Sequence, residues 1–288
     1  MPNAKLKFPA KRHGELAFSV QPSAFAGSAF TLVEMLVVIT ILGILAALTV
    51  PALKNLGKAN AVASASRQLL DAVGRARQQA IANHTTVYMV FVPTNFWSLP
   101  PGGWWPRVVS DPKQNAAAMS LCDRQLSGYA FIAYGAVGDQ PGQHAWHYLE
   151  PWQGLPEGSF IAQWKFGPRN LTNIVTDPAT GASYPVSGFA TAQIPFPTEA
   201  GPPGVPSALW PFFPYIAFNY LGQLTSGQNE YIPLARGSVL PARDANKALQ
   251  FSPPSVSESP PGNSTSAFNI VKIDWLTGRA VLLYQHVQ

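Results

Sequence analysis

The sequence predicts an α+β protein in which one long N-terminal helix precedes a mostly antiparallel β head. Residues 30–52 form an apolar stretch, residues 53–83 continue with helical periodicity, and most of the 28 prolines and all 8 tryptophans lie beyond residue 84. Proline interrupts helices and confines strands to short or edge positions. We therefore expect residues 85–288 to form one compact head of short strands and loops, after a helix over 30–84.

The apolar stretch 30–52 has the length of a membrane span. At about 1.5 Å per residue it covers a hydrocarbon core of roughly 30 Å, and it contains one acidic residue, Glu34. A carboxylate at the centre of such a helix costs about 2.5–3.5 kcal/mol, and less near its end. A chain that keeps this group is expected to provide a partner for it.

The first 29 residues are basic and lack a long apolar run. Positive segments stay on the cytoplasmic side of a membrane, so residues 1–29 should be cytoplasmic and the head should lie on the other side. Much of the formal charge of +5 belongs to this segment. The head is then close to neutral, and we do not expect a nucleic-acid partner.

The residues at the start of the apolar stretch resemble the type IV pilin and type II secretion pseudopilin precursors. Their shared motif is a small residue, then Phe-Thr-Leu-Val/Ile-Glu, then an apolar helix. Here Ala29 precedes Phe30-Thr31-Leu32-Val33-Glu34. Gly43 and Pro51 also fall where many members carry a helix glycine and a helix-kinking proline. The residue before the cut is usually glycine, and this chain has Ala29 instead.

The resemblance implies a processing and assembly role for this segment. A prepilin peptidase would cut between Ala29 and Phe30, remove the leader 1–29 and methylate the new amine of Phe30. Glu34 would pair with the Phe30 amine of a neighbouring subunit, and Pro51 would kink the helix. The implied partners are other pilins or pseudopilins, an inner-membrane assembly platform and membrane lipid. The alternative is an ordinary signal anchor in which Glu34 only reaches the membrane interface.

The chain resembles the pseudopilin H family most closely, in three short segments. These are the end of the long helix (residues 69–83), the strand that follows it (86–92) and the last hairpin (273–279). The middle of the head, about 93–210, matches no family that we can name. The amphipathic helix should pack through one apolar face, made of Leu53, Leu56, Ala63, Leu70, Val73, Ala80 and Ile81.

Turn signals and alternating residues predict the elements of the head. A short helix should begin after Asp111 as N-cap, with Pro112 at its first position, and end near Leu126. We expect hairpins between 215–220 and 231–240 and between 270–274 and 279–284, and loops at 195–214 and 252–267. The predicted strands are 86–92, 128–137, 144–149, 159–166, 213–220, 230–240, 268–274 and 279–286.

The head shows no arrangement typical of an enzyme or a metal site. His144 and His147 would face opposite sides of a strand, so we do not expect them to share a metal. The single cysteine, Cys122, has no histidine close in sequence and should be a small buried residue. The sequence contains no phosphate-binding or nucleophile motif in the head. We therefore expect neither catalysis nor a cofactor.

The aromatic residues of the head have two interpretations. Trp97, Trp104 and Trp105 could form an exposed surface for a sugar or a protein, or they could complete a core under proline-rich loops. We favour the core. The predicted function is a structural subunit, a minor pseudopilin or pilin of a type II secretion or type IV pilus-like assembly. The alternative is a surface-displayed carbohydrate- or protein-binding module that is exported and anchored through a pilin-type segment.

Overall fold

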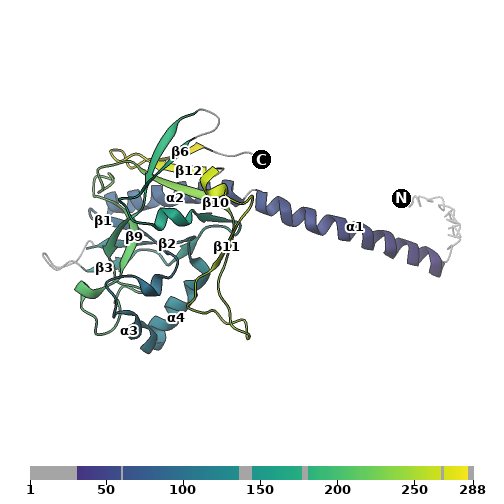
Figure 1. Cartoon of the computed structure of the whole chain (residues 1–288), viewed down its shortest axis with the longest axis horizontal. Helices are drawn as coiled ribbons and strands as arrows, with labels where there is room; N and C mark the ends of the chain where they lie inside the picture. The colour runs from purple at the N-terminus through teal and green to yellow at the C-terminus, as the bar shows by residue number, and fades with distance from the viewer. Residues whose placement is uncertain (1–30, 60, 136–144, 177–180, 267–268, 285–288) are drawn as a thin grey trace, which may run out of the picture. The chain divides into compact units, whose positions relative to one another are not determined.

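A computed structural model of the chain confirms the α+β class, with helices at the N-terminus and antiparallel strands after them (Figure 1). The chain divides into two compact units, Met1–Pro51 and Ala52–Gln288, and each is described by itself. For residues 47–59 and 284 only the backbone is described. The structure describes residues 31–59, 61–135, 145–176, 181–266 and 269–284.

The first helix, α1 (Leu32–Ala59), carries the apolar stretch. Every side chain from residue 31 to 46 is exposed, and Leu32 and Ile39 expose 82% and 63% of their surface. The backbone stays helical through Pro51, and the kink there stays a prediction. Within the described residues, no helix combines the length and the apolar character needed to cross a membrane. Parts of the predicted span 30–52, including Phe30, lie outside that description.

The second helix, α2 (Ala61–Ala82), packs into the head through a face of small residues. The predicted face was partly wrong: Leu69 is buried where Leu70 was expected, and Ile81 is exposed by 37%. The side chains of Leu53 and Leu56 lie outside the described residues, so only the part of the predicted face from Ala63 onward is tested. The buried residues of α2 are Ala61, Ala65, Ser66, Leu69, Ala72, Val73, Ala76 and Ala80.

The first sheet has the order β3-β2-β1-β9-β8, and β4 also pairs with β2. In β1, Val87, Met89 and Phe91 belong to the core cluster that contains α2, whereas Val90 belongs to a second cluster on the other face. Because neighbouring side chains of a strand point to opposite faces, both faces of this sheet are covered. Its strands are β1 (Thr86–Phe91), β2 (Gly128–Tyr134), β3 (Trp146–Tyr148), β4 (Gln153–Gly154), β8 (Ala190–Gln193) and β9 (Phe212–Phe218).

The second sheet has the order β11-β10-β12-β13, and β5 also pairs with β10. Ile232, Leu234, Val271 and Ile273 join the α2 cluster, so this sheet packs on the same helix as the first. A separate hairpin, β6 (Thr172–Thr176) with β7 (Ser183–Ser187), packs on Ile270. The strands of the second sheet are β5 (Ser159–Ile161), β10 (Glu230–Leu240), β11 (Ser255–Glu258), β12 (Asn269–Ile273) and β13 (Ala280–Tyr284).

Short helices and aromatic loops cover the far face of the first sheet. The predicted N-cap is confirmed: the Asp111 carboxylate accepts hydrogen bonds from the backbone N–H of Lys113 and Gln114, both at 2.9 Å. The helix ends earlier than predicted, at Ser120, and a 3₁₀ turn follows. The remaining helical elements are α3 (Trp105–Ser110), α4 (Pro112–Ser120), α5 (Asn263–Ser266), η1 (Phe96–Ser98), η2 (Cys122–Arg124), η3 (Gln163–Phe166) and η4 (Ser207–Leu209).

Of the two predicted hairpins, the last is confirmed and the other is wrong. The strands β12 and β13 pair with Ile273 opposite Ala280. The strand β9, in contrast, pairs with β1 and β8, and β10 lies in the other sheet. Both loop predictions need correction, since 195–214 contains η4 and the start of β9, and 252–267 contains β11 and α5. The predicted strand 159–166 ends at Ile161, and residues 163–166 form a 3₁₀ turn.

Burial predicts that replacing two tryptophans of the head, Trp104 and Trp275, destabilises the fold to very different extents. Trp104 is fully buried and its indole N–H donates to the Leu99 carbonyl at 2.9 Å, whereas Trp275 is 40% exposed. Trp104→Ala should lower the free energy of unfolding by about 3–5 kcal/mol. The matched control Trp275→Ala should lower it by less than about 1 kcal/mol. Chemical denaturation of the full chain measures both, and equal losses would contradict the assigned core.

Candidate functional site

The start of α1 is a capping box. The backbone N–H of Glu34 donates to the Thr31 hydroxyl at 3.2 Å, and the Thr31 backbone N–H donates to the Glu34 carboxylate at 3.4 Å. The Thr31 hydroxyl lies at the same distance from that carboxylate oxygen. A Ser or Thr with a Glu three residues later satisfies two free donors of a helix N-terminus in this way. Glu34 therefore has a local partner on its own chain.

This geometry gives the Glu34 carboxylate two physical advantages. It lies in the first turn of α1, where the helix dipole favours a negative charge. The carboxylate also lies beside the backbone of Thr31, which is the second residue after the predicted cleavage point. Ala29 and Phe30, the predicted cleavage and methylation residues, lie outside the described residues. The signal for the cap, Thr31-x-x-Glu34, is present in the sequence and was missed by the sequence analysis.

Gly43 leaves open space on α1. A Cβ added to this residue would meet no atom within 4 Å. A glycine in a helix interior costs about 1 kcal/mol relative to alanine, and among the described residues no close packing at Gly43 requires it. Small residues are, however, what allows two apolar helices to approach closely.

Among the described residues, those weighed for chemistry in the head form no group typical of an active site or a metal site. His147 lies on β3, and His144 lies outside the described residues. In the parts of the chain that the structure describes, no three His, Cys, Asp or Glu residues are grouped to hold a metal ion. Cys122 is buried, and burial together with the nearby Asp123 carboxylate raises the pKa of its thiol to about 11. A thiol with this pKa is a poor nucleophile at neutral pH.

The tryptophans of the 96–105 loop complete a core, as favoured from the sequence. Trp104 is fully buried, and Trp97 and Trp105 are partly buried against the same cluster. Phe96 is the centre of this arrangement, with edge-on contacts to Trp97 and Trp105 at ring distances of 5.2 and 6.0 Å. These rings therefore do not form an exposed platform on which a sugar could stack.

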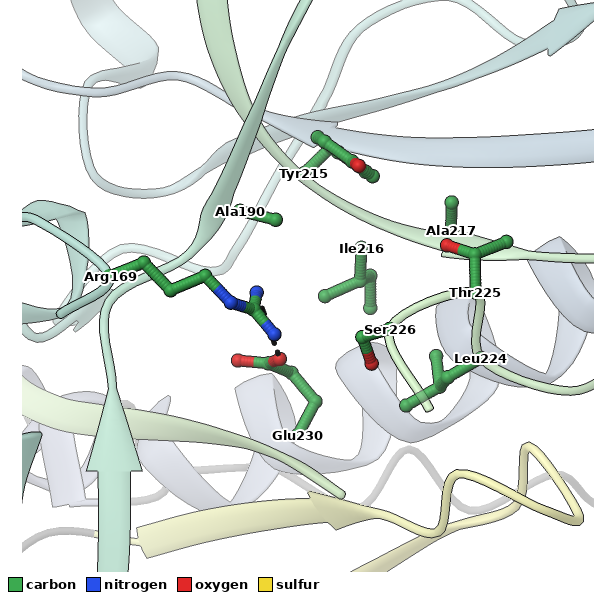
Figure 2. A pocket seen from close by; sticks show the side chains of 9 residues that line it. All are labelled: Arg169, Ala190, Tyr215, Ile216, Ala217, Leu224, Thr225, Ser226 and Glu230. Carbon is green, nitrogen blue, oxygen red and sulfur yellow. Dashed lines mark ion pairs between the residues drawn. The ribbon is translucent and has the colours of Figure 1, made fainter. Parts of the chain in front are cut away.

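The head contains a pocket that the sequence did not indicate. It has a volume of about 250 Å³ and lies between the first sheet and the start of β10. Figure 2 shows the Arg169 side chain reaching across it toward Glu230. The lining residues are Arg169, Ala190, Tyr215, Ile216, Ala217, Leu224, Thr225, Ser226 and Glu230.

A buried ion pair lies behind this pocket. The Lys165 ammonium group contacts the Glu230 carboxylate, donates to the Ser187 carbonyl at 2.7 Å and lies over the Phe189 ring at 4.6 Å. Lys165 is fully buried and Glu230 is 6% exposed. Burial lowers the pKa of Lys165, and the Glu230 charge opposes this effect. The pair joins the η3 turn to the second sheet.

Arg169 is the third member of this cluster and faces the pocket. Its guanidinium lies 3.9 Å from the second Glu230 oxygen, and its side chain is 37% exposed. The segment just before Arg169 packs closely against Gly188, because a Cβ added to Gly188 would overlap the Gly167 carbonyl oxygen. No sequence signal could have found this cluster, since its members lie up to 65 residues apart on different elements.

The buried pair should make Lys165 costly to replace alone. Lys165→Met leaves the buried Glu230 with only the more distant Arg169, at 3.9 Å, and should lower the free energy of unfolding by about 3–5 kcal/mol. The double variant Lys165→Met/Glu230→Gln should regain most of that loss. Arg243→Gln, which removes an ion pair that is about half exposed on both sides, is the control and should cost less than about 1 kcal/mol. A Lys165→Met loss no larger than that of the control would contradict the pairing.

Comparison with known proteins identifies the N-terminal segment. Residues 27–50 match the family described as the prokaryotic N-terminal methylation motif. The match includes Ala29, Phe30 and Glu34 and leaves the head unmatched. No curated protein and no solved structure matches the chain. The motif supports a type IV pilin-like precursor that a prepilin peptidase processes, and it points to a structural subunit rather than an enzyme.

Proposed function

We propose that the protein is a minor pseudopilin or pilin of a type II secretion or type IV pilus-like assembly, related to the pseudopilin H family. The observation that carries the proposal is the start of α1, where a methylation motif coincides with an exposed apolar helix. Exposed apolar surface of this extent is unstable in water and requires lipid or other subunits. The small residue Gly43, with no neighbour of its own, suits such helix-to-helix contact.

The proposal assigns a role to each part of the chain. Residues 1–29 are a cytoplasmic leader that the peptidase removes by cutting between Ala29 and Phe30. Residues 30–84 form the helix that enters the inner membrane through 30–52 and packs with other subunits on the assembly platform. The head, 85–288, lies in the periplasm or on a filament. The burial of Trp104 gives no support to the alternative of a sugar-binding module.

The mature N-terminus tests the processing step. Intact-mass and peptide mass spectrometry of the membrane fraction should find a chain that begins at N-methylated Phe30. Cells without the prepilin peptidase are the control and should contain only the chain that begins at Met1. A chain that still begins at Met1 in cells with the peptidase would overturn the assignment.

Two substitutions of Glu34 separate its cap from its charge. Glu34→Gln keeps an acceptor for the Thr31 N–H, because glutamine also serves in a capping box, but it removes the charge that would pair with a neighbouring Phe30 amine. We expect both Glu34→Gln and Glu34→Ala to be cleaved normally and to lose filament incorporation by about tenfold or more, as the loss of one buried charge pair implies. The measurement is the amount of variant co-purified with the other subunits. Normal incorporation of Glu34→Gln would show that the residue acts as a cap alone.

A further inference from the structure

We propose that the pocket at Arg169 binds a carboxylate group. Two cations, Lys165 and Arg169, share one anion there, Glu230, beside a cavity large enough for a carboxylate and the first atoms that carry it. This binding site is separate from the assembly role of α1. It concerns the head, which the methylation motif leaves unmatched.

The charges of the cluster favour a single negative charge as ligand. Lys165 and Glu230 are in contact and neutralise one another. Arg169 then carries the uncompensated charge, and the other residues that line the pocket are neutral. A second cavity beside the first has the same two charged residues, Arg169 and Glu230, in its wall. Both cavities therefore present the same excess positive charge.

The guanidinium of Arg169 is free to form hydrogen bonds to a ligand. Its distance of 3.9 Å to Glu230 exceeds a hydrogen-bond length, and within the described residues its N–H groups have no acceptor. A planar carboxylate accepts two parallel hydrogen bonds from a guanidinium, a geometry that a Lys cannot provide. A dianion such as phosphate would place its second charge near Glu230, so this pocket should prefer a monoanion.

The walls of the pocket would strengthen such a contact. Ala190, Ile216, Ala217 and Leu224 line the pocket together with polar side chains, and Figure 2 shows Ala190 and Ile216 on the side of the guanidinium. Ion pairs gain strength where neighbouring side chains displace part of the water, and the Arg169 side chain is only 37% exposed. Thr225 and Ser226 are exposed, so a ligand can enter from solvent. The carboxylate can belong to a small acid or to the end of a polypeptide chain.

The test uses the full chain in detergent micelles, with arginine side chains labelled for NMR. Acetate should shift one arginine Nε–H signal in a saturable manner, with a millimolar Kd, and inorganic phosphate at equal ionic strength should bind more weakly. Arg169→Gln should remove that signal and weaken binding about tenfold or more. Arg169→Lys keeps the charge and should bind with intermediate affinity. Arg243→Gln is the matched control, because Arg243 already pairs with Asp123 at 3.0 Å, and it should leave the affinity unchanged.

A pair of peptides distinguishes the two sources of the carboxylate. A short uncharged peptide with a free C-terminal carboxylate is compared with its C-terminally amidated form. Tighter binding of the free form than of acetate assigns the pocket to a chain end, and equal binding assigns it to a small acid. The proposal is overturned if acetate up to about 100 mM gives no saturable shift, or if a folded Arg169→Gln variant binds as well as the unchanged chain.

Discussion

The head depends on the packing of one alanine-rich helix face against two sheets. Ala65, Ala72, Ala76 and Ala80 of α2 are fully buried in the cluster that includes residues of β1, β2, β9, β10 and β12. Alanine side chains are short, so the helix lies close to the sheets, and the large side chains of the strands fill the space between them. Leu69 and Val73 are the larger residues that α2 contributes. Because both sheets use this face, a bulky residue on it would disturb the packing of both of them.

Local signals in the sequence predicted the fold where the structure is itself local. The β12–β13 hairpin and the Asp111 cap are formed by neighbouring residues, and both are confirmed. The predicted β9–β10 hairpin failed for a physical reason. The turn at Gly222 exists, and Phe218 bridges Leu224 across it, but the pairing ends there and β9 continues beside β1, more than a hundred residues earlier in the chain. Each strand has a pattern that predicts a strand, but neither pattern indicates a partner so far away in the chain.

The functional sites also divide into those formed by neighbouring residues and those formed by residues far apart in the chain. The prepilin-type motif is contiguous, and a match over residues 27–50 supports it. The capping box at Thr31 and Glu34 is equally local, and its spacing could have been recognised from the sequence. Lys165, Arg169 and Glu230 carry no such signal. In the sequence they are an ordinary lysine, arginine and glutamate, and only folding brings the charges together. Burial then separates their roles, because Lys165 is enclosed and Arg169 remains at the surface of a pocket.

The cap on α1 bears on how an acid in an apolar helix can drive assembly. The Glu34 carboxylate accepts hydrogen bonds at the start of its own helix, so it is not an unsatisfied charge. The proposed ion pair with a neighbour's amine would have to compete with this cap and with hydration. In water such a pair gains little, about 1 kcal/mol at contact, but the same attraction is several times larger near a low-dielectric phase. We infer that the exchange from cap to neighbour becomes favourable only where the helices are already surrounded by lipid or by one another. The exposed apolar face of α1 would then determine where assembly begins, and Glu34 would determine the register in which it proceeds.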